Sequence, residues 1–373
     1  MNGPGAPPPG GNDRSSDRPL SSGHSAPIEP HEAIRRGRAP VTQSIAVLRA
    51  KRALAAAGFG ADVPLERASS VTNEVWLTPD AVLRVNTRSD QRLRREALIA
   101  STLPPGLGYP TVLAYGGDLG SDWLVLERVS GRPLSRCWPT MTDAARQESV
   151  RQLAERLKIL HHCQPPTVPA LHDRPQLLDP AHTGAEAVVA LVAGLRRAAG
   201  LPRVEAKIMG DLERLVVGTC SALDPFDAKT LVHGDLTFEN ILWDSQEQRI
   251  TAILDFEWAR TGPPDLDLDV LLRCVAYPEL HVAADYEHLT RAVDYSQVPW
   301  WLAEAYPELF SVAGQLERVR LYAIAWDVKE LLRYPPSGPV DDLHPAHPYH
   351  RLVRTLRGTS YLDEMQRGIQ ATA

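Results

Sequence analysis

The sequence predicts an α+β fold with two lobes, a small strand-rich lobe followed by a larger, mainly helical lobe. Short runs of β-forming residues, separated by turn residues, occur between positions 65 and 127. Beyond Gly131 the apolar residues recur mostly at helical spacing. A short pair of strands is expected near residues 241–254, and polar motifs lie around it. A chain of 373 residues is long enough to form both lobes.

Composition divides the chain into three parts. Residues 1–40 are rich in Pro, Gly, Ser and charged residues, and they contain too few apolar residues to offset the entropy of ordering. We therefore predict a disordered tail over residues 1–40, a small lobe over residues 41–129 and a large lobe over residues 130–373.

The elements of the small lobe follow from local patterns. A helix is expected over residues 42–57, where apolar residues recur at helical spacing before Gly58. A second helix is expected from Asp90, as its N-cap, to Leu103, which two prolines follow. The strands of this lobe are expected at residues 65–69, 75–77, 81–85, 112–115 and 123–127.

The large lobe is expected to be mostly helical. Apolar residues from Val150 to Leu160 share one helical face, and helical patterns return over residues 184–220 and from Leu268 onwards. Residues 164–180 contain five prolines and are expected to form a loop. Short strands are expected at residues 231–232, 241–243 and 250–254.

Composition also argues against several classes of protein. The formal net charge of -6 is unlike the basic excess of nucleic-acid-binding domains. No apolar run approaches the roughly 18 residues of a membrane helix, and no signal-peptide pattern is present. The cysteines are too widely separated for a disulfide framework or a zinc site, at Cys137, Cys163, Cys220 and Cys274. We therefore predict a cytoplasmic protein with no nucleic-acid or membrane partner.

Two motifs carry the strongest functional signal. The first is HGDLTFENIL at His233–Leu242, and the second is ILDFE at Ile253–Glu257. Together they resemble the catalytic loop and metal-binding aspartate of the aminoglycoside phosphotransferase and choline kinase superfamily, whose pattern is H-G-D-x-x-x-x-N followed by a strand ending in D-[FW]. The resemblance extends over about residues 65–275 and implies a two-lobed, protein-kinase-like fold.

This resemblance implies a role for each motif residue in transfer of the γ-phosphoryl group of ATP. Asp235 would accept or orient the proton of the substrate hydroxyl, and His233 would support the loop. Asn240 and Asp255 would hold magnesium, a hard cation that prefers oxygen ligands. A lone H-G-D is usually a turn and a lone aspartate after a strand is usually a cap, so the assignment depends on their joint spacing.

The small lobe contains weaker counterparts of a nucleotide site. Ser70 and Asn73 lie in a loop that covers the ATP phosphates in this family, although a plain hairpin turn is the alternative interpretation. Arg84, on the third strand, resembles the residue that binds the α- and β-phosphates. Glu96, on the next helix, would pair with Arg84 and orient it, unless it forms only a surface ion pair.

Adenine is expected to bind backbone groups in the connection between the lobes, from Glu127 to Val129. This expectation comes from the resemblance, since backbone contacts leave little trace in a sequence. Protein kinase activity is disfavoured, because Asp255-Phe256-Glu257 replaces D-F-G and no A-P-E segment is present.

The segment from Asp255 to Asp269 contains five acidic residues and one basic residue. Asp267 best matches a family aspartate that holds the catalytic loop. Glu257, Asp265 and Asp269 have two interpretations, as capping or solvated charges or as part of an acidic cleft for a cationic substrate.

The region beyond residue 275 is expected to shape the acceptor pocket. Trp300 and Trp301 could line that pocket, or they could belong to the core. Asp327 and Glu330 are candidate contacts to amino groups of the acceptor, with solvated carboxylates as the alternative.

We therefore predict an ATP- and magnesium-dependent phosphotransferase that acts on a hydroxyl of a small, cationic molecule, an aminoglycoside-like antibiotic being the first candidate. The first alternative is a metabolic kinase of an amino alcohol or a sugar. The second is a pseudokinase that binds nucleotide without turnover, which the presence of Asp235, Asn240 and Asp255 disfavours.

Overall fold

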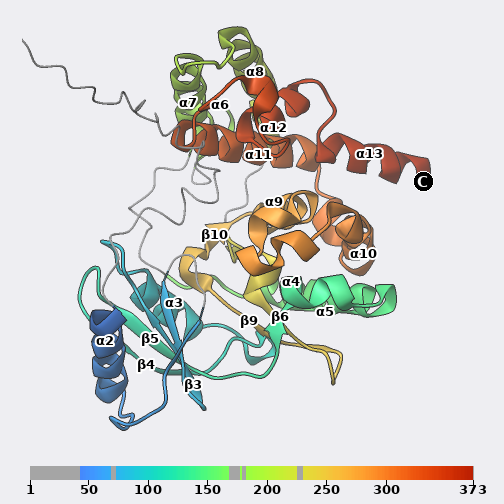
Figure 1. The fold of residues 1–373 in the computed structure, drawn as a ribbon. Helices are drawn as coiled ribbons and strands as arrows, with labels where there is room; N and C mark the ends of the chain where they lie inside the picture. The colour runs from blue at the N-terminus through green and yellow to red at the C-terminus, as the bar shows by residue number, and fades with distance from the viewer. Residues whose placement is uncertain (1–42, 69–72, 168–176, 179–181, 225–229, 373) are drawn as a thin grey trace, which may run out of the picture.

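A computed structural model describes residues 43–68, 73–167, 177–178, 182–224 and 230–372. The predicted two-lobed α+β fold is confirmed: a sheet with two helices forms one end of the molecule, and the remainder is mostly helical (Figure 1). The predicted tail over residues 1–40 lies outside the described residues, as does most of the proline-rich segment.

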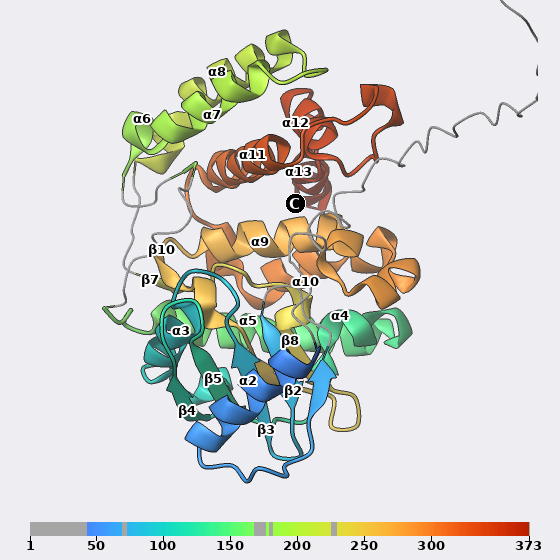
Figure 2. The same ribbon diagram turned by 60° about the vertical axis from the view of Figure 1, so that its left-hand side comes forward.

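The small lobe is built on a five-stranded antiparallel sheet with the order β1-β2-β3-β5-β4. Helix α2 (Gln43–Ala56) lies across one face and α3 (Arg92–Ala100) on the other (Figure 2). The strands are β1 (Glu66–Ala68), β2 (Glu74–Leu77), β3 (Ala81–Val85), β4 (Val112–Gly116) and β5 (Trp123–Glu127).

Alternation along the central strand β3 determines where its one basic side chain points. Leu83 and Val85 are fully buried and pack with Ala50 and Leu54 of α2. Because successive side chains of a strand point to opposite faces, Arg84 points to the face that α3 covers. Strand β3 therefore places the guanidinium group of Arg84 against α3.

The predicted N-cap of α3 is wrong. The helix begins at Arg92, its N-cap residue is Gln91, and the Gln91 side chain makes no capping hydrogen bond. Asp90 instead binds the Arg92 side chain and accepts a hydrogen bond from Nδ2 of Asn86 at 2.7 Å. Asp90 thus lies one residue before the N-cap, where local contacts hold its carboxylate, including the backbone N–H of Arg92 at 3.3 Å.

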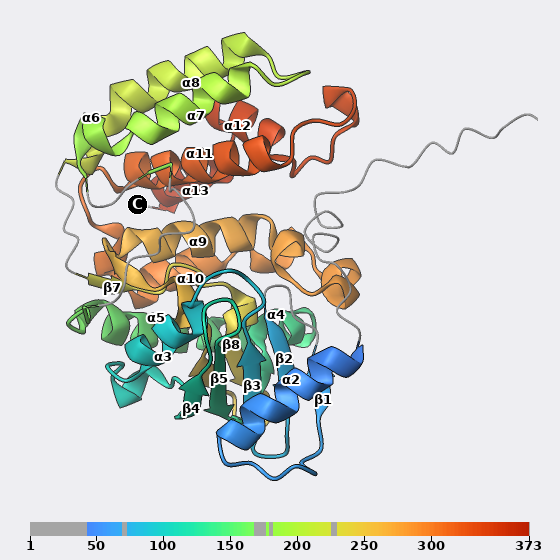
Figure 3. The same cartoon turned by 90° about the vertical axis from the view of Figure 1, so that its left-hand side faces the viewer.

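Stacked layers of helices form the large lobe (Figure 3). Helices α7 and α8 form the outermost layer, α11 lies in the next, and α9 lies in the third, which of these three layers is nearest the small lobe. One continuous hydrophobic core holds them, and it includes the predicted buried face of α5 from Val150 to Leu160. The helices are α4 (Leu134–Cys137), α5 (Asp143–His162), α6 (Gly184–Ala187), α7 (Val189–Ala199), α8 (Ala206–Thr219), α9 (Asp265–Ala276), α10 (Val298–Ala305), α11 (Gln315–Arg333), α12 (Pro348–Leu356) and α13 (Tyr361–Thr372).

Two small sheets in this lobe position the polar motifs. Strand β7 (Thr230–Val232) pairs with β10 (Arg260–Gly262), and β8 (Ile241–Asp244) pairs with β6 (Arg132–Pro133) and β9 (Arg249–Ile253). The chain crosses between these sheets twice, through residues 233–240 and 254–259. Both motif loops therefore lie between the same two sheets.

The four cysteines are free thiols, which agrees with the prediction from their spacing. Among the described helices, none combines the length and the apolar character needed to cross a membrane.

Candidate active site

The loop between β7 and β8 is held from behind by a buried histidine. His233 donates from Nε2 to the carbonyl oxygen of Leu254 at 2.8 Å, and its Nδ1 accepts from the backbone N–H of Asp235 at 3.3 Å. The ring packs against Phe256 at 4.5 Å between centroids. Burial lowers the pKa of His233, which keeps the ring neutral. This geometry matches a supporting role rather than that of a base.

Asp267 anchors the same loop from α9. Its carboxylate is completely buried and accepts from the backbone N–H groups of His233 at 2.9 Å and Gly234 at 2.8 Å. His161 contributes a third contact at 3.2 Å. Burial opposes the charge, but the interaction with His161 and these backbone bonds hold the pKa of Asp267 below its usual value. The structure thus places Asp267 where the sequence predicts it.

Gly234 occupies a position that has no room for a side chain. Its φ is +78°, and a Cβ there would lie 2.6 Å from the carbonyl oxygen of Trp258. We expect Gly234→Ala to lower the free energy of unfolding by about 2–4 kcal/mol, since it combines left-handed backbone strain with overpacking against backbone.

Denaturant unfolding would measure this effect, with Gly218→Ala in α8 as the control. No atom lies within 4 Å of a Cβ at Gly218, so that variant should be neutral or up to about 1 kcal/mol more stable. Equal stability of the Gly234→Ala variant and the wild type would contradict the packing described here.

Asp235 lies in this loop and is partly buried. Burial raises its pKa to about 8, and the carboxylates of Asp255 and Glu257 add to the rise. Arg273 and Lys329 act in the opposite direction. A carboxylate with a raised pKa is a better proton acceptor near neutral pH than an ordinary one.

Asn240 and Asp255 are brought together at the base of the β8–β9 hairpin. The backbone N–H of Leu254 donates to the carbonyl oxygen of Asn240 at 2.8 Å, and Nδ2 of Asn240 donates to the carbonyl oxygen of Asp235 at 2.8 Å. Asp255 has a left-handed backbone, with φ of 67°. Such backbone strain in a residue other than glycine is often found at functional sites.

The ion pair predicted between Arg84 and Glu96 is present, at 2.6 Å and buried on both sides. Arg84 also reaches Oδ1 of Asp255 at 2.7 Å. Glu96 accepts further hydrogen bonds from Tyr109 and from the backbone of Phe256. Burial raises the pKa of Glu96 to about 7, against the opposing effect of Arg84.

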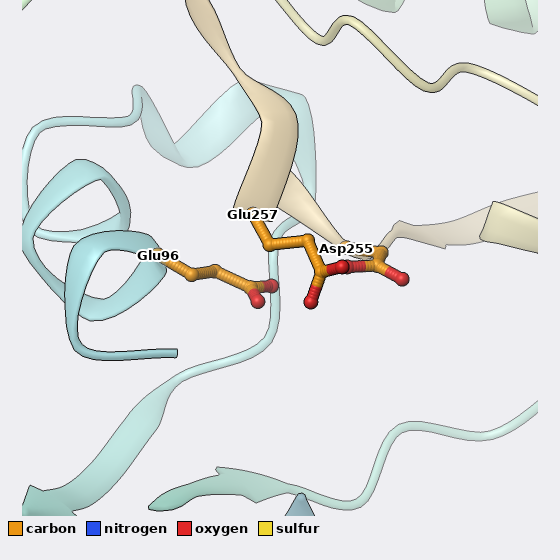
Figure 4. Close-up of side chains that lie close together, drawn as sticks. All are labelled: Glu96, Asp255 and Glu257. Carbon is orange, nitrogen blue, oxygen red and sulfur yellow. The ribbon is translucent and has the colours of Figure 1, made fainter. Parts of the chain in front are cut away.

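Three carboxylates converge around this guanidinium. Figure 4 shows Glu96, Asp255 and Glu257 pointing toward one another, and one oxygen of each lies within 4.8 Å of the others. Their mutual repulsion is offset by Arg84, which contacts all three. Residues of β3 and α3 in the small lobe and of the segment after β9 in the large lobe therefore form one polar cluster.

The sequence model that describes the phosphotransferase enzyme family matches residues 65–301, more than half of the chain. The chain belongs to this phosphotransferase family. A search of curated proteins finds no significant match.

Solved structures share the kinase-like fold of this phosphotransferase at low sequence identity. A choline/ethanolamine kinase family protein from Mesorhizobium loti is 21% identical, with 87% of this chain and 99% of that chain covered and a TM-score of 0.54. The GDP complex of aminoglycoside 2'-phosphotransferase-IIIa is 17% identical, covering 82% and 93%, with a TM-score of 0.53. A thermostable variant of aminoglycoside phosphotransferase APH(4)-Ia with AMP-PNP and hygromycin B is 17% identical, covering 79% and 93%, with a TM-score of 0.52. The chain is thus a kinase-like phosphotransferase.

Glu257 does not occupy the position that the sequence suggested. Its side chain is buried, and it accepts from Asn73 Nδ2 at 2.9 Å and pairs with Arg84 and Arg92, each at 3.2 Å. The expected contact between Glu257 and an acceptor is therefore wrong, because neighbouring cations already hold this carboxylate. It ties the loop of Asn73 to the Arg84 cluster instead.

The remaining residues predicted to bind the nucleotide are Ser70, Glu127 and Val129. Ser70 lies outside the described residues. Glu127 is exposed at the end of β5, and its backbone N–H donates to the carbonyl oxygen of Thr111 at 2.8 Å. Val129 is partly buried in the connection between the lobes. Adenine binding by this connection stays a prediction.

The residues predicted to contact the acceptor differ in their surroundings. Asp327 is buried and pairs with Arg351 at 2.7 Å, so the prediction that it contacts an amino group is wrong. Glu330 is half-buried on α11 and stays a candidate. Trp300 lines a cavity of ≈ 530 Å³ in the large lobe, whereas Trp301 packs on the hydrophobic core.

Sequence reasoning missed two arginines of α3 that complete the site. Arg92 binds Glu257 and lies over the Trp258 ring at 4.8 Å, and Arg95 donates to the backbone carbonyls of Glu257 and Ala259. The signal was their spacing, since Arg92, Arg95 and Glu96 share one face of a helix. Charged residues on a face that also carries buried Ile99 indicate a polar site under the helix.

Proposed function

We propose that this phosphotransferase transfers the γ-phosphoryl group of ATP to a hydroxyl group of a small molecule, with magnesium as cofactor. The observation that carries the proposal is the convergence of Asp235, Asn240 and Asp255 with the Arg84–Glu96 pair. ATP as donor is supported by the AMP-PNP in the APH(4)-Ia complex, although the aminoglycoside 2'-phosphotransferase-IIIa complex contains GDP.

Asn240 and Asp255 supply the donor atoms that suit magnesium. Because Asn240 donates its amide to the Asp235 backbone, its side-chain carbonyl oxygen is left to bind a cation. Asp255 is 22% exposed and uses Oδ1 for Arg84, which leaves Oδ2. When bound, magnesium would neutralise phosphate charge during transfer. Arg84 would bind phosphate oxygens through the guanidinium edge that now contacts Asp255.

Asp235 is proposed to accept the proton of the acceptor hydroxyl as its oxygen forms a bond to the γ-phosphorus. The bond between that phosphorus and the bridging oxygen breaks, and ADP leaves with that oxygen. Asp267 and His233 act as positioning residues, because they accept hydrogen bonds from the backbone N–H groups of residues 233–235. Most of the rate enhancement would come from positioning and charge neutralisation.

The choice among acceptors is open within this proposal. Hygromycin B in the APH(4)-Ia complex supports an aminoglycoside-like acceptor, and the choline/ethanolamine kinase neighbour supports an amino alcohol. Antibiotic inactivation and a cytoplasmic location are predictions from sequence. The alternative of a pseudokinase is disfavoured by the intact set of Asp235, Asn240 and Asp255.

Nucleoside diphosphate release from ATP tests the proposal. We expect release that a hydroxyl compound stimulates, that EDTA lowers at least about 100-fold, and that added magnesium restores. Magnesium-dependent ATP binding without turnover would support the pseudokinase instead. Release that EDTA does not affect would remove the role given to Asn240 and Asp255.

A further inference from the structure

The acidic segment over residues 255–269 divides into two groups according to the lobe that each side chain contacts. Three of its acids are held within the large lobe, namely Asp265 by Arg318, Asp267 by His161 and Asp269 by Arg273. Asp255 and Glu257 instead bind side chains of the small lobe. The start of the acidic segment therefore connects the two lobes.

Glu257 belongs to the large lobe, but its side-chain contacts with described residues all go to the small lobe. Its Oε2 accepts from Nδ2 of Asn73 at 2.9 Å and from Arg84 at 3.2 Å. Its Oε1 accepts from Nη1 of Arg92 at 3.2 Å. The residue is only 1% exposed. One buried carboxylate thus joins the residue before β2, the strand β3 and the helix α3.

The contact with Asn73 reaches the loop that is expected to cover the nucleotide phosphates. Asn73 is 4% exposed and immediately precedes β2. Because an ionised carboxylate only accepts hydrogen bonds, Glu257 fixes the amide nitrogen of Asn73 toward the large lobe. A hydrogen bond to an ionised acceptor is also stronger than one between neutral groups. The end of this loop is therefore tied to a residue two positions beyond Asp255.

The backbone around Asp255 is held by α3 as well. The backbone N–H of Phe256 donates to Oε1 of Glu96 at 3.1 Å, and the carbonyl oxygen of Glu257 accepts from Nη1 of Arg95 at 2.9 Å. The left-handed conformation of Asp255, with φ of 67°, persists only where the surrounding structure imposes it. Because this short segment is held at several points, a displacement of Glu257 would shift Asp255 with it.

The two cations of Glu257 differ in what nucleotide binding would do to them. Arg84 is the guanidinium proposed above to turn to the phosphate oxygens. Arg92 has no such role, and its contacts with Asp90 and with the Trp258 ring hold it in place. Glu257 therefore keeps one buried cation when Arg84 moves, and its contact with Asn73 can persist in the nucleotide complex.

We propose that Glu257 is a positioning residue that couples the Asn73 loop to Asp255, so that phosphates bound by the small lobe meet the magnesium bound by the large lobe. The inference rests on the proposed function, since it concerns the same nucleotide site. Its consequence is that magnesium and nucleotide strengthen each other's binding through Glu257.

Titration with AMP-PNP in the absence and presence of magnesium measures this coupling without turnover. We expect Glu257→Gln and Asn73→Ala each to lower the ratio of Kd without magnesium to Kd with magnesium by about tenfold. The double variant should lower it no further than either single variant, since both remove one contact. A general loss of stability would weaken the two titrations alike and leave the ratio unchanged.

Asp265→Asn is the control, because it weakens a buried ion pair with Arg318 inside the large lobe. It should leave the ratio of the two Kd values at the wild-type level. An unchanged ratio in both Glu257→Gln and Asn73→Ala would overturn the proposal. Effects that multiply in the double variant would overturn it too, because the two side chains would then act independently.

An exchange of the two groups provides a second measurement. Asn73→Asp places two carboxylates against each other and should lower the ratio at least as much as Asn73→Ala. Adding Glu257→Gln restores an amide facing a carboxylate, and the ratio should return to within about threefold of the wild type. A double variant no better than Asn73→Asp alone would contradict the proposal. Failure of the proposed function gives a different result, namely a wild-type protein whose affinity for AMP-PNP does not respond to magnesium and which releases no ADP from ATP.

Discussion

Asp235→Asn is expected to lower kcat by about 10³-fold or more while nucleotide affinity changes less than about twofold. The amide cannot accept the hydroxyl proton, but it has the size and shape of the carboxylate. The backbone of residue 235 donates to His233 and accepts from Asn240, so the loop should keep its conformation. Stopped-flow or steady-state ADP release and nucleotide titration would measure the two quantities.

The control for this variant is Asp341→Asn, which removes an exposed carboxylate from a short helical turn in the large lobe. It should retain full activity. An Asp235→Asn enzyme within tenfold of wild-type kcat would show that Asp235 does not accept the proton. A parallel loss of nucleotide affinity and unfolding midpoint would point to a structural role instead.

Arg84→Met is expected to lower the free energy of unfolding by about 3–5 kcal/mol in the absence of divalent cations. The substitution removes the shared partner of three carboxylates whose oxygens lie within 4.8 Å of one another, at Glu96, Asp255 and Glu257. Nucleotide affinity should fall at least about tenfold, because a phosphate-binding guanidinium is lost.

Magnesium should partly reverse the destabilisation, since a cation among those carboxylates would replace the lost charge. Thermal unfolding with and without magnesium would reveal this as a larger rise in Tm for Arg84→Met than for the wild type. Arg318→Met is the matched control, because it breaks a buried ion pair with Asp265 in the large lobe. An equal response to magnesium in both variants would show that magnesium does not compensate for the lost charge of Arg84.

Much of the fold follows from local patterns. The helical face from Val150 to Leu160 and the strand β3 are where periodicity places them, because burial of one face imposes that spacing. Strands β6 and β10 were not predicted, since Arg132-Pro133 and Arg260-Thr261-Gly262 contain Pro or Gly and no run of β-forming residues. The predicted cap at Asp90 was wrong by one residue, because the helix begins at Arg92 with Gln91 as its N-cap while the Asp90 carboxylate binds Arg92 and Asn86.

The sequence by itself indicated the family, since HGDLTFEN and ILDFE place Asp235, Asn240 and Asp255 in a recognisable order, and it predicted these residues as the site. The tertiary structure decided which of the remaining charged side chains are available to a substrate. Glu257 is held by Arg84 and Asn73, more than 170 positions away in the chain, and Asp327 is held by Arg351 from another helix. Such pairs depend on which helices pack together, and burial makes each acid take the nearest cation. The local sequence shows neither which helices pack together nor which cation lies nearest to each buried acid. The sequence therefore suggested a cationic acceptor from an acidic segment that faces inward in the folded protein.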